Sequence, residues 1–213
     1  MSAAATVVRA ALREHIRIPD AVFDQLYPDH VRRLSAVHWT PIAAALRAAE
    51  LLAPRCDARV LDIGAGAGKL CCVGAAAYAG SWHGIERDPD LVAVAVQTAH
   101  MLDVSPHASF RAGDALAVDW RGFTGIYLFN PFESQRFGGG FARVAGGAGH
   151  GEQIAATQAR LTSLLPGTRV VTFHGFGGDM PPEFALAGLE HVEGGRLALW
   201  IKRSRAARIA QGR

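Results

Sequence analysis

The stretch of sequence that decides the fold reads Val60-Leu61-Asp62-Ile63-Gly64-Ala65-Gly66-Ala67-Gly68-Lys69. An apolar run is followed by three alternating glycines and then by residues typical of the start of a helix. This order predicts a buried strand, a tight turn and a helix, the arrangement with which an α/β sheet makes room for a nucleotide-like ligand. Because glycine lacks a Cβ atom, the backbone amides of such a turn can approach a ligand closely.

The acid before the turn and the spacing of the glycines distinguish this motif from the dinucleotide-binding fingerprint. That fingerprint reads Gly-x-Gly-x-x-Gly after an apolar residue, whereas Asp62 stands two residues before Gly64 in a Gly-x-Gly-x-Gly run. The motif resembles the first motif of the class I, seven-strand methyltransferases, which bind S-adenosylmethionine (SAM). The resemblance implies that Asp62, Gly64, Ala65, Gly66 and Gly68 contact SAM, with the acid neutralising its ammonium group or bracing the loop. The alternative is an ordinary strand-turn-helix that uses small residues for packing.

Composition and length predict one soluble domain with a proper core. The chain has 213 residues, of which 50% are hydrophobic and 19% charged, as in ordinary globular proteins. No apolar run approaches the roughly 18 residues of a spanning helix, and the N-terminus lacks a signal-peptide core. We therefore expect a cytoplasmic protein without a membrane association. The three cysteines and nine histidines show no paired spacing, so neither a disulfide framework nor a metal site is expected.

Hydrophobic periodicity and turn residues predict strands that alternate with helices. The expected helices cover 3–16, 40–54, 69–78, 88–101 and 152–165, and the expected strands cover 59–63, 82–86, 109–112, 125–129, 169–174, 189–193 and 197–202. Such alternation predicts a parallel sheet with helices on both faces. The closing hairpin across Gly194-Gly195 resembles the antiparallel seventh strand of the methyltransferases.

The predicted fold class is therefore α/β: a doubly wound, mostly parallel seven-stranded sheet with an antiparallel C-terminal hairpin and an N-terminal helical cap. We expect a single domain over residues 1–213, divided into a cap (1–55), a Rossmann-like core (56–203) and a basic tail (204–213). The formal net charge is +3, and a basic tail can bind nucleic acid. A frayed, solvated terminus is favoured instead, because no aromatic residues interleave with the charges.

Acids at two further strand ends fit a nucleoside. Glu86 ends the second strand, where a carboxylate can accept both ribose hydroxyls; the alternative is an acid serving a helix N-terminus, a role that Asp88 already fills. Asp114 follows the third strand, and the family resemblance implies that it accepts from the adenine amino group while the amide of Ala115 contacts the ring. The alternative for Asp114 is an ordinary turn residue. We take Glu86, Arg87, Asp114 and Ala115 as cofactor-binding residues.

The end of the fourth strand carries the candidate acceptor site, Asn130-Pro131-Phe132. This run resembles the Asn/Asp-Pro-Pro-Phe/Tyr motif of methyltransferases that modify adenine or glutamine amines, but it lacks one proline. The resemblance implies that Asn130, which is also counted among the cofactor-binding residues, orients an acceptor amine, with Pro131 fixing the backbone and Phe132 lying against the methyl group. The alternative is a strand that ends in a turn, for which Asn-Pro is common.

Thr40-Pro41 opens the second expected helix. Together with the glycine turn and Gly84-Ile85-Glu86, it resembles the non-SET, seven-strand histone lysine methyltransferases and small bacterial proteins like them. In that group a threonine folds over the methionine end of SAM. Thr40, with His38 or Trp39 beside it, is therefore a candidate cofactor contact; serving as an ordinary helix N-cap is an equal alternative for Thr40.

The sequence thus predicts methyl transfer from SAM to an acceptor, expected to be an amine nitrogen on a protein, a nucleic acid or a small molecule. A non-catalytic SAM- or nucleotide-binding sensor or scaffold is the alternative. A nicotinamide dehydrogenase is disfavoured by Asp62, by Lys69 at the place of the third fingerprint glycine, and by the closing hairpin. Neither the acceptor nor the oligomeric state follows from the sequence.

Overall fold

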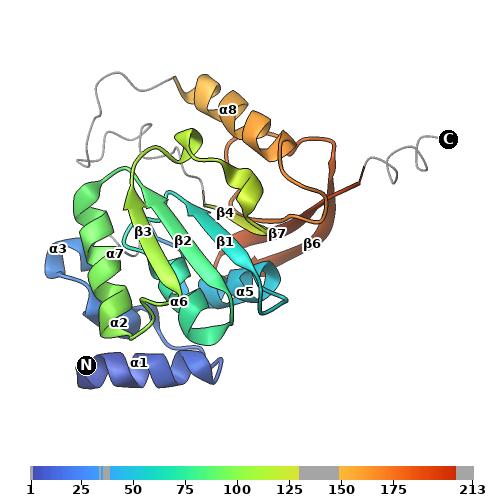
Figure 1. Ribbon diagram of the computed structural model, residues 1–213. Coiled ribbons are helices and arrows are strands. Elements are labelled where there is room, and N and C mark those ends of the chain that lie inside the picture. Colours follow the sequence, from blue (N-terminus) through green and yellow to red (C-terminus); the bar gives the residue numbers. More distant parts are fainter. Residues whose placement is uncertain (1, 34, 36–38, 130–148, 205–213) are drawn as a thin grey trace.

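A seven-stranded sheet forms the centre of the protein, for which the computed structural model describes residues 2–33, 35, 39–129 and 149–204 (Figure 1). The strand order is β3-β2-β1-β4-β5-β7-β6. The strands are β1 (Arg59–Ile63), β2 (Ser81–Glu86), β3 (Ala108–Ala112), β4 (Gly125–Phe129), β5 (Arg169–Phe173), β6 (Phe184–Val192) and β7 (Gly195–Lys202). The first five are parallel, whereas β7 runs antiparallel to both β5 and β6. The predicted fold class is confirmed.

Helices cover both faces of the sheet because successive strand residues point to opposite sides. The helices are α1 (Ala3–Arg13), α2 (Asp20–Phe23), η1 (Asp24–Leu26), α3 (Asp29–Arg32), α5 (Ile42–Leu52), α6 (Lys69–Ala77), α7 (Pro89–Met101), η2 (Ala115–Ala117), η3 (Trp120–Gly122) and α8 (His150–Thr162). Val60 and Tyr127 pack into a core with α1, α5, α6 and α7. Leu61 and Ile126 pack into a second core with α8 and Trp120. None of the helices within the described ranges has both the length and the apolar character needed to cross a membrane.

The structure departs from the sequence prediction mainly in the N-terminal cap and in β6. Two prolines, Pro19 and Pro28, stand at the N-caps of α2 and α3, so residues 20–32 form short helices where none was expected. Strand β6 begins at Phe184 rather than Leu189, because a register shift between Leu186 and Gly188 interrupts the alternation that marks a strand.

The N-cap role considered for Thr40 is wrong. Helix α5 begins at Ile42 with Pro41 at the N-cap and no capping side chain there. The amide of Ile42 donates instead to Oδ1 of Asp20, at 3.1 Å. The hydroxyl of Thr40 is therefore available for another partner, the phenol of Tyr127, at 2.9 Å.

The contact between α6 and β2 has no space for an additional methyl group at Gly74. A Cβ atom there would lie 2.6 Å from the ring of Trp82, a fully buried side chain. We expect Gly74→Ala to lower the free energy of unfolding by up to about 2 kcal/mol, because an overpacking cost of about 1–3 kcal/mol outweighs the gain of about 1 kcal/mol in helix propensity. Urea denaturation measures the change.

Gly151 provides the matched control, since it also lies in a helix but a Cβ atom added there would have no described atom within 4 Å. Gly151→Ala is expected to stabilise the protein by about 0.4–1 kcal/mol. A Gly74→Ala variant as stable as wild type would show that α6 does not pack on Trp82 in this way.

Candidate functional site

A small cavity lies at the carboxyl ends of β1 and β4, where the strand order reverses. Its volume is about 40 Å³, and its lining residues are Trp39, Thr40, Asp62, Gly64, Ala65, Lys69, Leu70, Tyr127 and Phe129. In open α/β sheets, ligands bind outside the carboxyl ends of the strands at such a reversal. The cavity therefore marks the candidate site, and it contains four of the residues that the sequence assigned to the cofactor.

The turn between β1 and α6 has a backbone that only glycine adopts readily. Gly64, Gly66 and Gly68 have φ angles of 75°, 53° and 78°, in the left-handed region. A Cβ atom on Gly66 would lie 2.8 Å from Nε1 of Trp39, and one on Gly68 would lie 2.7 Å from the ring of Phe110. All three glycines are thus required by the backbone, and Gly66 and Gly68 are also required by the side chains packed against them.

Glu86 binds the glycine turn itself. Its Oε2 accepts from the amide of Gly66 at 2.9 Å, and its Oε1 accepts from the amides of Arg87 and Asp88 at 2.7 and 3.0 Å. A carboxylate oxygen has two lone pairs, so Glu86 can still accept from a ligand hydroxyl. The expected ribose contact stays a prediction, and the structure adds a second role, bracing the turn.

Arg87 and Asp114 meet across the ends of β2 and β3. Nη2 of Arg87 lies 3.2 Å from Oδ1 of Asp114, and the same oxygen accepts from the amide of Leu116 at 2.9 Å. The latter bond caps η2, the short helix that begins at Ala115. Asp114 therefore has the local turn role that was considered as the alternative for it. Adenine recognition by Asp114 and Ala115 stays a prediction.

Asp62 is a buried acid beneath the cavity, with an exposed fraction of 4%. Burial raises its pKa from the ordinary value of 3.8 to about 8, and the nearby carboxylate of Glu86 adds to the increase. The thiol of Cys71, 3.9 Å from Oδ2, acts in the opposite direction as a weak donor. Asp62 is therefore protonated at neutral pH in the free protein, and a cation placed beside it favours the ionised form.

Thr40 and Trp39 form the wall of the cavity that comes from the N-terminal cap. Thr40 is buried and bonded to Tyr127, and the indole of Trp39 lies against Gly66 and packs edge-on to Tyr27, with 5.4 Å between ring centroids. Burial raises the pKa of the Tyr127 phenol far above its usual range, so this group stays neutral and can donate or accept a hydrogen bond.

Sequence reasoning did not assign a site role to Tyr127, Leu70 or Phe129, although all three line the cavity. A tyrosine between Ile126 and Leu128 in a strand buried on both faces is an unusual choice, and this was the available signal. The predicted acceptor residues Asn130, Pro131 and Phe132 lie outside the described residues, as do His38 and the tail from 205 onward. In the sequence, Asn130, Pro131 and Phe132 directly follow Phe129, the last residue of β4.

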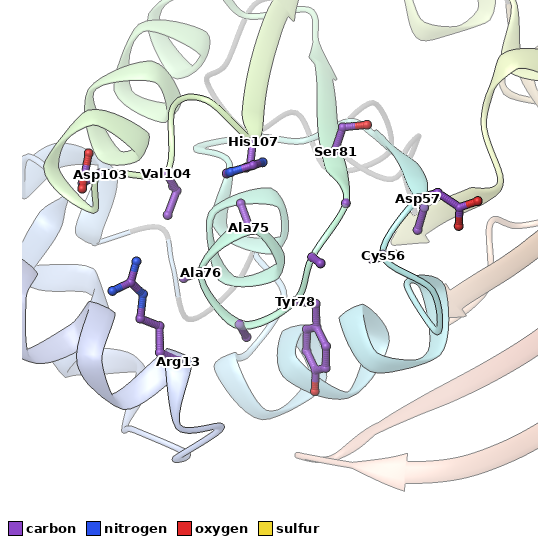
Figure 2. A pocket seen from close by; sticks show the side chains of 14 residues that line it. Arg13, Cys56, Asp57, Ala75, Ala76, Tyr78, Ser81, Asp103, Val104 and His107 are labelled. Carbon is purple, nitrogen blue, oxygen red and sulfur yellow. The ribbon is translucent and has the colours of Figure 1, made fainter.

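A larger groove of about 590 Å³ lies at the opposite, amino-terminal edge of the sheet (Figure 2). Arg13, Asp57, Asp103 and His107 surround it, and its floor is made of small residues from the end of α6. It is open to solvent, and neither the glycine turn nor the strand-end acids reach it. The smaller cavity is the better candidate site despite its volume.

Comparisons with known proteins agree with the fold. No family model and no curated protein sequence matches the chain. Among solved structures, a methyltransferase from Geobacter sulfurreducens superposes with a TM-score of 0.61 at 16% identity, over 92% of this chain and 97% of that chain. An RNA methyltransferase from Salinibacter ruber, in complex with S-adenosyl-L-homocysteine, superposes with a TM-score of 0.58 at 23% identity, over 76% of this chain and 91% of that chain.

An O-methyltransferase from neocarzinostatin biosynthesis, in complex with SAM and a naphthoic acid, gives a TM-score of 0.54 at 16% identity, over 86% of this chain and 57% of that chain. At these identities the likeness establishes the fold of the class I methyltransferases. RNA and O-methyltransferases share that fold, so it does not identify a methyl acceptor.

The raised pKa of Asp62 predicts a specific dependence of stability on pH. Between its ordinary pKa of 3.8 and about 8, Asp62 holds a proton in the folded state but not in the unfolded chain. The free energy of unfolding should therefore fall as pH rises through this window, by up to about 1.4 kcal/mol per pH unit from this group, and level off above pH 8. Asp62→Asn removes the titratable carboxyl group, and with it this dependence of the free energy of unfolding on pH.

Urea denaturation of both proteins at pH 5, 6.5 and 8 tests the effect, because contributions from other groups cancel in the difference. The variant should gain stability relative to wild type at each step. A difference that stays constant from pH 5 to pH 8 would show that Asp62 is ionised in the folded protein throughout.

Proposed function

We propose that the chain transfers a methyl group from SAM to an amine nitrogen of an acceptor. One observation supports this above all: at the reversal of strand order, the left-handed glycine turn lies between Asp62, which lines the cavity, and Glu86, which accepts from the amide of Gly66. That set matches the needs of an adenosine carrying a cationic amino-acid arm. The fold, and the SAM and S-adenosyl-L-homocysteine bound to the superposed structures, point to the same cofactor.

The proposed orientation places the methionine end of SAM near Asp62 and Thr40, and the adenosine near Glu86 and Asp114. SAM carries an ammonium and a sulfonium group. A buried carboxyl group that ionises when a cation arrives stabilises the first, and the faces of Trp39 and Phe129 attract the second. Thr40 in the wall also supports the finer resemblance to the non-SET lysine methyltransferase group, without indicating a histone substrate.

Methyl transfer needs alignment more than acid–base catalysis. It is an in-line displacement at carbon: the acceptor nitrogen forms the new bond while the carbon–sulfur bond breaks, and the thioether leaves with the electron pair. Positioning of two reactants in this way supplies up to about 7–11 kcal/mol. We assign the acceptor side to Asn130, Pro131 and Phe132, which follow the cavity residue Phe129 in the sequence. An amine that arrives neutral requires no strong base.

The acceptor is identified by incubating the protein with SAM labelled in the methyl group and fractionated cell extract. Label in a protein, nucleic acid or small-molecule fraction establishes transfer and names the class of acceptor. Binding of SAM without label in any fraction would instead favour a non-catalytic sensor or scaffold, and failure to bind SAM would overturn the proposal.

Glu86→Ala tests the cofactor assignment. A hydrogen bond to a charged group contributes about 1.5–3 kcal/mol, so affinity for SAM should fall by about ten- to a hundred-fold. Because Glu86 accepts from three backbone amides in and beside the turn, the variant should also lose thermal stability. Calorimetry with SAM gives the first quantity and thermal unfolding the second.

Asp88→Ala is the matched control, since the side chain of Asp88 lies beside Glu86 in sequence but caps α7, accepting from the amides of Asp90 and Leu91. It should lose about 1 kcal/mol of stability and retain its affinity for SAM. Equal affinities of wild type and Glu86→Ala would leave Glu86 with the bracing role alone.

Asn130→Ala distinguishes a methyltransferase from a non-catalytic SAM-binding protein. If Asn130 orients the acceptor, the variant should bind SAM within a few-fold of wild type but transfer methyl about a hundred-fold more slowly, the cost of a misplacement of about 1 Å. Asn130→Asp keeps an acceptor oxygen, so partial activity indicates a nitrogen held through that oxygen. Transfer by Asn130→Ala at the wild-type rate would show that the acceptor is held elsewhere.

A further inference from the structure

The ammonium group of Lys69 is buried where the N-terminal cap meets the glycine turn. Lys69 is the first residue of α6, and its side chain is 3% exposed. Its Nζ donates to Oδ1 of Asp20 and to Oγ of Ser35, both at 2.8 Å, and lies 2.8 Å from Oδ1 of Asp24. The ammonium group thus donates two hydrogen bonds and forms an ion pair with the buried carboxylate of Asp24.

All three oxygens belong to the cap. Asp20 begins α2, Asp24 begins η1, and Ser35 lies between α3 and α5. The same Oδ1 of Asp20 accepts from the amide of Ile42 at the start of α5. One buried charge therefore joins the helix behind the glycine turn to several segments of the cap, and its removal would leave two carboxylates together without a counter-charge.

A row of aromatic rings connects this cluster to the wall of the cavity. Nζ of Lys69 lies 5.7 Å from the centroid of Phe23, whose ring packs edge-on to Tyr27 at 5.7 Å, and Tyr27 packs in turn against Trp39 at 5.4 Å. The indole of Trp39 lies against Gly66. The residues that surround the ammonium group thus also support the side of the cavity formed by Trp39 and Thr40.

We infer that Lys69 is a positioning residue for SAM, an inference that rests on the proposed function. It holds Trp39 and Thr40 over the glycine turn and does not itself bind the carboxylate of the cofactor. Two carboxylates already face its single charge, so the cluster of Lys69, Asp20 and Asp24 is negative in sum. A third carboxylate would be repelled there and would also have to displace one of the oxygens.

This role predicts an effect confined to the amino-acid half of the cofactor. Trp39 and Thr40 line the cavity together with Asp62, while Glu86 and Asp114 stand at the proposed adenosine end. The compound 5′-methylthioadenosine has the adenosine and the sulfur of SAM but lacks its amino-acid arm. A loosened cap should therefore weaken the binding of SAM and leave 5′-methylthioadenosine nearly unaffected.

The experiment measures the dissociation constants of SAM and 5′-methylthioadenosine for wild type and Lys69→Met by calorimetry. If the arrangement of Trp39 and Thr40 over the glycine turn falls to about a tenth of the population, the dissociation constant of SAM rises about tenfold. The dissociation constant of 5′-methylthioadenosine should change less than about twofold. Lys202→Met is the control for a purely structural loss. Lys202 is also buried and donates to the carbonyl of Thr162 at 2.9 Å, at the opposite edge of the sheet. Lys202→Met should have a lower Tm than wild type but the same ratio of the dissociation constants of SAM and 5′-methylthioadenosine.

Asp24→Asn distinguishes positioning from direct binding, and Ser35→Ala repeats the test with a milder change should Lys69→Met not fold. Positioning requires both variants to weaken SAM selectively. A Lys69 that bound the cofactor carboxylate would gain from the loss of a competing charge, so Asp24→Asn would bind SAM as tightly as wild type or more tightly. That result, or an equal loss of both ligands in Lys69→Met, overturns the inference. Wild type that binds no SAM overturns the proposed function and this inference with it, whereas wild-type binding with unchanged variants overturns the inference alone.

Discussion

The turn from β1 into α6 is the constraint on which the carboxyl edge of the sheet depends. Its backbone takes the left-handed conformation at Gly64, Gly66 and Gly68, which residues with a Cβ atom rarely adopt. Side chains from elsewhere use the space: Trp39 of the cap lies on Gly66, and Phe110 of β3 lies on Gly68. Glu86 then fixes the turn by accepting the amide of Gly66. Without the glycines neither the cap nor β3 could pack as it does.

Charge at this edge is arranged for a cation. Asp62 is buried with no basic partner among the groups that shift its pKa, and it stays protonated to about pH 8. Lys69, the nearby base, already faces Asp20 and Asp24. A buried, unpaired acid destabilises the free protein whenever the solvent would ionise it. The ammonium and sulfonium groups of SAM, placed here by the proposed function, would favour the ionised form of Asp62.

The sequence was sufficient for the sheet but not for the cap. The glycine turn, Asp88-Pro89 and the closing hairpin each carry a local signal, and the structure has β1, α7 and the hairpin where those signals placed them. The short helices before Ser35 have no such periodicity, and their position depends on the buried contact with Lys69, a residue more than 30 positions away. Tyr127 and Phe129 were missed for the same reason. They line the cavity together with Trp39 and Thr40, which are far from them in the sequence, and no local sequence pattern indicates this neighbourhood.

The cavity is small compared with a whole cofactor. About 40 Å³ holds no more than a few water molecules, while small-molecule sites are usually about 300–1,000 Å³. The cavity therefore accommodates only part of a molecule of the size of SAM, and Glu86 and Asp114 are not among its lining residues. In the proposed orientation the adenosine lies at Glu86, which ends β2, and at Asp114, which follows β3, so its binding does not depend on the cap. In that orientation the amino-acid arm is the part of the ligand that meets Trp39 and Thr40, the two cavity residues connected through Phe23 and Tyr27 to the buried ammonium group of Lys69.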